Sequence, residues 1–257
     1  MRFRSLGSGS SGNATVVEAT DGLQVSRLLV DCGFGIRQLE ARLARAGLGC
    51  AQLDAIFITH EHADHIGCAV ALARKHRIAL WMSRGTYAAI GAPELDGLLC
   101  IAADGQSIAL GCLQVQPFTV PHDAREPLQL SCSDGQRKLG ILTDLGHASS
   151  HVSASLQHCH ALLLECNHDL ALLAQSSYPA FLKARVAGRL GHLCNEDAAA
   201  LAHALQHPGL NTVVAAHLSE HNNRPVLARQ ALAQALGRAP EDIGTASASE
   251  GTDWLSV

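Results

Sequence analysis

The chain has 257 residues, of which 47% are hydrophobic and 16% are charged, and this composition excludes a disordered or fibrous protein. Its 19 Lys and Arg against 23 Asp and Glu give a formal net charge of −4, so it lacks a uniformly basic surface and any nucleic-acid partner must be held locally. A chain of this length can bury one sizeable core, and we expect a single domain over residues 1–257.

The cellular compartment is predicted from the apolar segments and the cysteines of the sequence. No stretch of about eighteen apolar residues occurs, and the N-terminus has no apolar segment of the kind found in signal peptides, so we predict neither a membrane span nor secretion. Nine cysteines without a C-x-x-C pair suit a reducing environment. We therefore expect a cytoplasmic protein with no membrane partner.

The first half of the chain mixes strand and helix patterns. Apolar, β-branched runs predict strands at Thr15–Glu18, Leu28–Asp31, Ala55–Thr59 and Ile78–Met82, and helical patterns lie at Ile36–Ala46 and Ile66–His76. The next segment predicts an antiparallel group of strands at Ser107–Leu110, Leu113–Val120, Leu128–Cys132 and Lys138–Thr143.

The last third alternates again. It predicts strands at Ala161–Glu165 and Thr212–Ala216, with helices at Leu170–Gln175, Pro179–Val186, Glu196–His207 and Pro225–Leu236. Two such halves with helices on the outside predict an α/β fold, a four-layer αββα sandwich of two mixed β-sheets.

A cluster of metal-ligand residues follows the predicted strand Ala55–Thr59. The sequence there is His60-Glu61-His62-Ala63-Asp64-His65, immediately before a helix. Side chains alternate along an extended segment, so His60 and His62 point to one side, while the turn into the helix directs Asp64 and His65 elsewhere. The spacing predicts two metal sites with one pair of ligands each, and a surface loop with incidental histidines is the alternative.

Further ligand-type residues end other predicted strands. His122 can be the third histidine at the first metal, Asp144 can bridge both metals, and His217 can complete the second. Imidazole and carboxylate ligands suit two divalent ions, Zn²⁺ or Mn²⁺, with Fe also compatible.

The ordered set H-x-H-x-D-H, H, D and H resembles the metallo-β-lactamase superfamily. Further segments resemble its YycJ/WalJ branch: Ser8-Gly9-Ser10-Ser11-Gly12-Asn13, Leu29-Val30-Asp31-Cys32-Gly33, Gly191-His192-Leu193-Cys194-Asn195, Ala216-His217-Leu218-Ser219 and Asn222-Asn223-Arg224-Pro225. The resemblance spans Ser8 to about Pro225, and Cys194 stands where the branch usually has Ser.

The resemblance implies a metal-dependent hydrolase in which a metal-bridged hydroxide attacks a phosphodiester. It implies a 5′ to 3′ exonuclease that acts on a DNA end and serves replication or repair. Asp64, His192 and Glu165 would be the catalytic residues: His192 would contact the scissile phosphate or protonate the leaving group, and Glu165 would orient it. Asp31 would support the metal ligands by hydrogen bonds.

Substrate contacts are expected from polar residues near these motifs. The candidates are Ser10, Ser11, Asn13, Asn195, Asn222 and Asn223, although Asn beside Gly or Pro is equally typical of turns. Local cations that could contact phosphates are Lys183, Arg185, Arg189 and Arg224, although an ordinary solvated helix face explains them as well.

Two other functions stay open at this point. The same site could hydrolyse a small phosphodiester or a thioester, which the net negative charge and the 4% aromatic content favour. A non-catalytic, metal-binding regulatory module is the third possibility, although a structural site is normally closed and seven ligands over two metals leave open positions.

Overall fold

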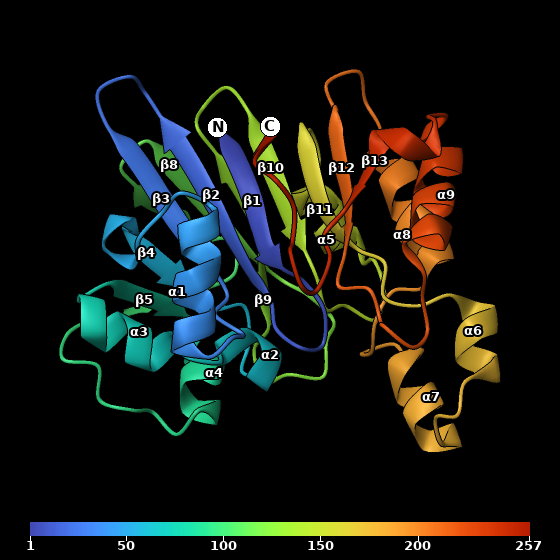
Figure 1. Cartoon of the computed structure of the whole chain (residues 1–257), viewed down its shortest axis with the longest axis horizontal. Coiled ribbons are helices and arrows are strands. Elements are labelled where there is room, and N and C mark those ends of the chain that lie inside the picture. Colours follow the sequence, from blue (N-terminus) through green and yellow to red (C-terminus); the bar gives the residue numbers. More distant parts are fainter.

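The computed structural model describes residues 1–257 as two packed seven-stranded β-sheets with helices outside them (Figure 1). The first sheet has the order β14-β1-β2-β3-β4-β5-β6. Its strands are β1 (Arg2–Gly7), β2 (Ala14–Thr20), β3 (Val25–Val30), β4 (Ala55–Phe57), β5 (Ala79–Met82), β6 (Leu99–Ile101) and β14 (Leu255–Ser256). The second has the order β13-β12-β11-β10-β9-β8-β7. Its strands are β7 (Ile108–Leu110), β8 (Leu113–Thr119), β9 (Leu128–Ser133), β10 (Lys138–Leu142), β11 (Ala161–Glu165), β12 (Thr212–Ala216) and β13 (Ile243–Thr245).

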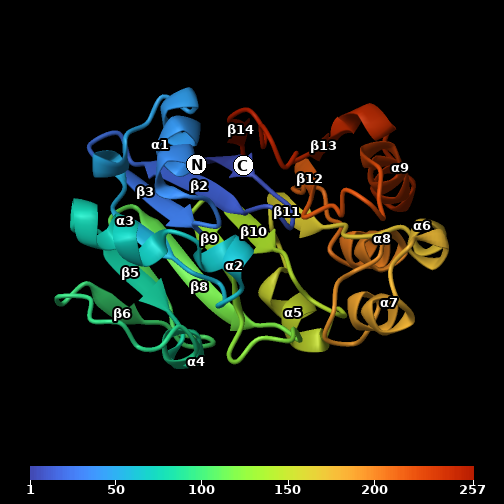
Figure 2. The same cartoon turned by 60° about the horizontal axis from the view of Figure 1, so that its bottom comes forward.

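The helices lie on both outer sides of the sandwich. Those of the first half are α1 (Ile36–Arg45), α2 (Ala63–Ile66), α3 (Ala69–His76) and α4 (Arg84–Ala89). Those of the second half are α5 (Ser150–Ser155), α6 (Leu170–Gln175), α7 (Ala180–Val186), α8 (Asn195–Ala204) and α9 (Pro225–Leu236), and the short 3-10 helices are η1 (Cys50–Gln52) and η2 (Pro240–Asp242). Figure 2 shows α1 and α3 on one side of the sandwich and α8 and α9 on the other.

Three apolar clusters fill the spaces between the four layers. Successive residues of a strand point to opposite faces of the sheet, so one strand contributes side chains to two clusters. In β11, Leu163 packs between the two sheets, whereas Leu162 and Leu164 pack in the cluster that includes residues of α8 and α9. In β3, Val30 packs between the sheets and Leu29 packs with residues of α1 and α3. This arrangement confirms the predicted αββα sandwich.

The direction of the strands explains where polar residues gather. Strands β3 to β6 of the first sheet are parallel, and so are β10 to β13 of the second. Parallel strands bring their carboxyl ends to one edge, and ligands commonly bind there. The loops after β3, β4, β10, β11 and β12 therefore meet at the lower edge of the sandwich in Figure 1, close to α2.

One predicted helix, Ile66–His76, ends where expected but begins later, at Ala69. The segment Ile66–His76 is not a single helix, because the chain breaks between α2 and α3. Gly67 has φ of +32°, and a Cβ there would lie 2.2 Å from the carbonyl oxygen of Cys32. The break therefore lets the loop after Asp64 pack directly on the end of β3. Strands β1, β6, β13 and β14, helices α4 and α5 and the two 3-10 helices were not predicted.

None of the helices combines the length and apolar character that crossing a membrane requires.

Candidate metal centre

Three residues of the site lie just beyond strand ends in a backbone conformation that L-residues rarely adopt. Asp31 has φ of 62°, Asp144 has φ of 54° and His217 has φ of 52°. Each such position costs of order 1 kcal/mol or more and persists only where its surroundings hold it. Asp31 from the first sheet and Asp144 from the second both contact His65, at Nδ1 and Nε2, and His217 Nδ1 lies 3.1 Å from Asp144 Oδ1.

The first group of donors consists of His60, His62 and His122, whose ligand atoms lie within 4.8 Å of one another. His60 is completely buried at the end of the β4 segment, and His122 follows β8. His122 Nε2 lies 3.3 Å from His62 Nδ1. The sequence expectation that His60 and His62 share one side is consistent with this grouping.

The second group consists of Asp64, His65 and His217. Asp64 Oδ2 lies 3.6 Å from both His65 Nε2 and His217 Nε2. Asp144 stands between the two groups: its Oδ2 lies 3.0 Å from His65 Nε2, and its Oδ1 lies 4.0 Å from His122 Nε2. The seven residues expected as metal ligands are thus brought together.

Outer partners orient four of the histidines in the same way. The Nδ1 atom of His60 lies 3.0 Å from Thr59 Oγ1, that of His65 lies 2.8 Å from Asp31 Oδ2, that of His122 lies 3.1 Å from the Gly191 carbonyl and that of His217 lies 3.0 Å from Glu165 Oε1. Such partners fix the tautomer and direct Nε2 inward, as they do for metal-bound histidines.

Buried atoms without a hydrogen-bond partner mark the centre. Thirteen buried side-chain atoms of the chain make no hydrogen bond, and three of them lie at this centre: His60 Nε2, His217 Nε2 and Asp144 Oδ2, which is close to His65 Nε2 without being hydrogen-bonded to it. Buried polar groups are usually paired, so three such atoms facing one centre need a common partner. Nitrogen and carboxylate donors aimed at shared points fit divalent cations. The residues present therefore suit metal ions. Asp31 lies where a support for the metal ligands would: its Oδ2 lies 2.8 Å from His65 Nδ1, and its Oδ1 accepts from Thr59 N at 2.9 Å.

The buried carboxylates of the centre, Asp144 and Glu165, stabilise positive charge on their neighbours. Burial alone lowers the pKa of His217, but Asp144, Asp64 and Glu165 raise it to about 10. Burial raises the pKa of Asp144, but His217 and His65 hold it well below its usual range. Bound cations would satisfy this charge in place of protons.

His192 and Glu165 form a pair beside the metal ligands. His192 Nδ1 lies 2.8 Å from Glu165 Oε1, and the Glu165 side chain is fully buried. Burial lowers the pKa of His192, but Glu165 raises it above its ordinary value. Burial raises the pKa of Glu165, but the interaction with His192 lowers it to about 2. The charged carboxylate therefore stabilises a protonated His192 whose Nε2 is available to the cavity.

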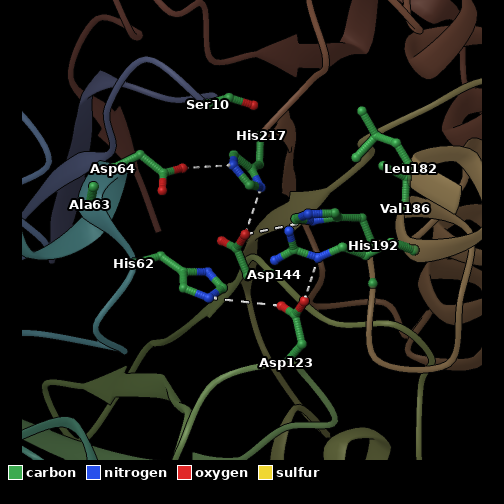
Figure 3. Close-up of a pocket in the computed structure, with 12 residues that line it drawn as sticks. Ser10, His62, Ala63, Asp64, Asp123, Asp144, Leu182, Val186, His192 and His217 are labelled. Carbon is green, nitrogen blue, oxygen red and sulfur yellow. Dashed lines mark hydrogen bonds and ion pairs between the residues drawn. The ribbon is translucent and has the colours of Figure 1, made fainter. Parts of the chain in front are cut away.

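A cavity of about 360 Å³ opens onto these residues. Its lining consists of Ser10, His62, Ala63, Asp64, Asp123, Asp144, Leu182, Arg185, Val186, Gly191, His192 and His217. Figure 3 shows Leu182 and Val186 across the cavity from Asp64 and His62. One wall therefore carries the metal donors, and the opposite wall, on α7, combines the apolar Leu182 and Val186 with Arg185.

Most of the expected substrate contacts lie elsewhere. Ser10 lines the cavity, but Ser11 does not. Asn13 is buried, and its Nδ2 donates to the carbonyl of Asp64 at 3.2 Å, so it braces the metal loop. The buried position of Asn13 does not fit direct contact with a substrate, whereas Ser11 is exposed next to Ser10 and its contact with a substrate stays a prediction.

The other three asparagines are also outside the cavity. Asn195 and Asn223 bind each other reciprocally, at 3.0 and 2.8 Å, and tie the start of α8 to the loop before α9. Asn222 is buried and donates to Ser219 Oγ at 3.3 Å. Cys194 Sγ accepts from Asp197 N at 3.4 Å, so the thiol caps α8 as a hydroxyl would.

Several residues of the site were not assigned from the sequence. Thr59 joins Asp31 to His60, Asn167 donates to the His217 carbonyl at 3.0 Å, and Ser8 Oγ accepts from His217 N at 2.9 Å. Asp123 lines the cavity and binds Arg185 Nε at 2.7 Å. For Asn167 and Asp123, a position just after a predicted strand was a signal in the sequence. Thr59 and Ser8 carried no such signal.

A further group of donors, Glu40, Cys50 and His76, lies near α1 and α3, away from this centre. Lys75 Nζ already binds Glu40 at 2.6 Å. Because that carboxylate has a cationic partner, we assign this group no metal.

Comparison with known proteins gives one consistent result. A family model described as the Beta-lactamase superfamily domain matches residues 26–218. Exodeoxyribonuclease YycJ of Bacillus anthracis is 33% identical, covering 98% of this chain and 96% of that protein, and exodeoxyribonuclease WalJ of Streptococcus pneumoniae is 32% identical, covering 95% and 91%. The metallo-beta-lactamase fold protein YhfI of Bacillus subtilis superimposes with a TM-score of 0.75 at 16% identity, covering 99% and 98% of the two chains, which establishes a shared fold.

Proposed function

This chain belongs to the β-lactamase superfamily, and from that membership we propose that it is a metal-dependent 5′ to 3′ DNA exonuclease of the cytoplasm. The observation that carries the proposal is the open centre in which inward-facing histidine nitrogens meet the Asp144 carboxylate beside the His192–Glu165 pair. Likeness over nearly the whole chain to two proteins named exodeoxyribonucleases supports DNA as the substrate. The nine cysteines are all free thiols, which supports a reducing compartment.

The centre would hold two divalent ions, Zn²⁺ or Mn²⁺, with Fe also compatible. His60, His62 and His122 would hold one, Asp64, His65 and His217 the other, and Asp144 would face both. When bound, such ions lower the pKa of water and neutralise charge on a phosphodiester.

Residues of the chain would orient the substrate, supply a proton to the leaving group and exclude water. The Asp64 carboxylate lies 3.6 Å from two ligand histidines and is accessible from the cavity, so it orients groups bound at the second set of donors. His192, with its pKa raised by Glu165, holds a proton at Nε2 for the departing sugar oxygen. The apolar wall of Leu182 and Val186 limits the water around that oxygen.

The same geometry would accept a small phosphodiester or a thioester, and the substrate decides between these chemistries. A phosphodiester leaves as an alkoxide that needs a proton, which His192 supplies, whereas a thiolate leaves without one. Presence of the His192–Glu165 pair therefore favours the phosphodiester.

The test compares the wild-type chain with Asp64→Ala on DNA carrying a 5′-phosphate or a 5′-hydroxyl, in the presence of Mn²⁺. Asp253→Ala is the matched control, because the Asp253 side chain is 97% exposed. We expect mononucleotides from the wild type and the control only, with Asp64→Ala folded but lower in metal content. If the wild type leaves DNA intact but cleaves a small phosphodiester or a thioester, that compound is the substrate class instead. If the wild type binds its full complement of metal but turns over none of these substrates, a regulatory module is favoured.

A further inference from the structure

Helix α7 forms the wall of the cavity that faces the metal donors. Leu182, Arg185 and Val186 line the cavity from consecutive turns, and none of the residues of α7 is buried in the protein core. Figure 1 shows α6 and α7 standing apart from the two sheets, at the same edge as α2. This helix is therefore positioned to meet whatever enters the centre.

The charge of this region is opposite to that of the whole chain. From Leu170 to Asn195 there is no Asp or Glu, while Lys183, Arg185 and Arg189 are cations, in a chain whose formal charge is −4. Arg185 and Arg189 also line a second groove, which shares Asp123, Arg185 and Gly191 with the first. Asp123 binds Arg185 Nε at 2.7 Å, so Lys183 and Arg189 carry the unpaired positive charge, and the remaining guanidinium nitrogens of Arg185 stay available. A local cationic track beside a metal centre favours a polyanion over an apolar or acidic peptide partner.

The region also exposes apolar side chains. Of six large hydrophobic residues that are exposed in the whole chain, three lie here: Leu170, Phe181 and Leu190. Phe181 is 75% exposed. Residues four apart on a helix are neighbours, so the Phe181 ring stands one turn before Arg185 on the same side of α7. An exposed aromatic ring therefore lies one helical turn from Arg185, which lines the cavity.

The start of the His192 loop fixes this helix relative to the catalytic histidine. His192 N donates to the carbonyl of Val186 at 2.8 Å. A Cβ on Gly191 would lie 2.2 Å from the carbonyl oxygens of both Arg185 and Val186, so only glycine permits this close approach. The distance between the exposed ring and the reacting centre is thus set by the backbone.

We propose that α7 is the platform for the single-stranded 5′ end of the substrate, with the Phe181 ring stacked on a base and Arg185 and Arg189 contacting phosphates. This rests on the proposed nuclease function and specifies how that site selects DNA over a small phosphodiester. Stacking on an aromatic face beside cations is the general way in which proteins hold single strands without reading their sequence. Phe181 does not line the cavity, so the proposal predicts that a small phosphodiester is bound there without its ring.

The experiment measures KM and kcat for Phe181→Ala, Phe181→Trp and Leu23→Ala on a single-stranded oligonucleotide and on bis(4-nitrophenyl) phosphate. Leu23 is the matched control, because it is an apolar residue that is 97% exposed in the turn between β2 and β3. Loss of one base–aromatic stack should raise KM of Phe181→Ala for the oligonucleotide by about 5- to 100-fold. Phe181→Trp should restore it, and turnover of the small ester should stay at the wild-type rate in all variants.

A second oligonucleotide that lacks the bases of its 5′-terminal nucleotides separates stacking from other roles. The difference between wild type and Phe181→Ala should disappear on it. An unchanged KM on the normal strand, or an equal increase on the abasic strand, would overturn the platform while leaving the nuclease function standing. If the wild type leaves both strands intact, the nuclease function itself fails, and the platform with it.

Discussion

Exchange of Glu165 for Gln tests how the carboxylate organises the centre. Glu165 Oε1 accepts from His192 Nδ1 at 2.8 Å and from His217 Nδ1 at 3.0 Å, while Oε2 accepts from the backbone N–H groups of Leu145 and Leu193 at 3.1 and 3.0 Å. All four neighbours are donors. Gln has the same shape but replaces one acceptor oxygen with a donor group.

The expected loss of stability follows from these contacts. In either orientation of the amide, two buried donors lose their acceptor, at about 1–3 kcal/mol each, so we expect about 2–6 kcal/mol. For a domain of this size that corresponds to a lowering of Tm by roughly 4–24 °C. The fold should survive, because typical stabilities are about 5–15 kcal/mol.

The expected loss of activity depends on the leaving group. Without the carboxylate, the pKa of His192 falls, and its proton is no longer held for the departing oxygen. Turnover of DNA should drop by about 100-fold or more, the usual contribution of a general acid. Bis(4-nitrophenyl) phosphate should be affected much less, since nitrophenolate leaves without a proton.

The assay combines thermal unfolding with kcat on both substrates, and the exposed Glu241→Gln is the control. An unchanged Tm would refute the hydrogen-bond reasoning. An equal drop on both substrates would refute the role of His192 as proton donor.

Three further predictions follow from other contacts. His192→Ala should lower kcat on DNA while metal content stays at the wild-type level; loss of a metal equivalent would make His192 a ligand. Gly33→Ala should lower metal content and activity together, because its Cβ would lie 1.7 Å from the carbonyl oxygen of Asp64; full metal occupancy would contradict this. Burial raises the pKa of Glu18, but Arg2 and Arg27, each at 2.7 Å, lower it below 4.5. The stabilisation by this pair, of order 1 kcal/mol, is therefore present above pH 4.5 and lost as the pH falls through the lowered pKa. The difference in urea midpoint between wild type and Glu18→Gln should shrink in that acid range, and a constant difference would exclude the ion pairs as its source.

Local patterns were sufficient for most of the fold. The strands Ala161–Glu165 and Thr212–Ala216 and the helix Pro225–Leu236 were predicted with their observed bounds, because apolar runs and a proline at the first helical position act locally. Strand β6 has only three residues, Leu99–Ile101, so its apolar run is too short to distinguish a strand from a loop. It forms because a neighbouring strand supplies hydrogen bonds.

The metal-ligand residues of the centre could be predicted, because a metal site requires His and Asp side chains. The metal ligands are consecutive or end strands, so their chemistry is visible in the sequence. The asparagines were not predictable in the same way, since the pairing of Asn195 with Asn223 and the bond from Asn13 to Asp64 arise only when distant loops meet. The cavity wall formed by Leu182 and Arg185 likewise depends on the packing of α7.

The most direct test of the proposed function follows one DNA strand labelled in separate preparations at its 5′ and at its 3′ end, incubated with the protein and Mn²⁺. We predict that the 5′ label is released at once as a mononucleotide, while the 3′-labelled strand shortens stepwise, and that a chelator stops both. Early release of the 3′ label, or internal fragments that retain the 5′ label, would contradict a 5′ to 3′ exonuclease.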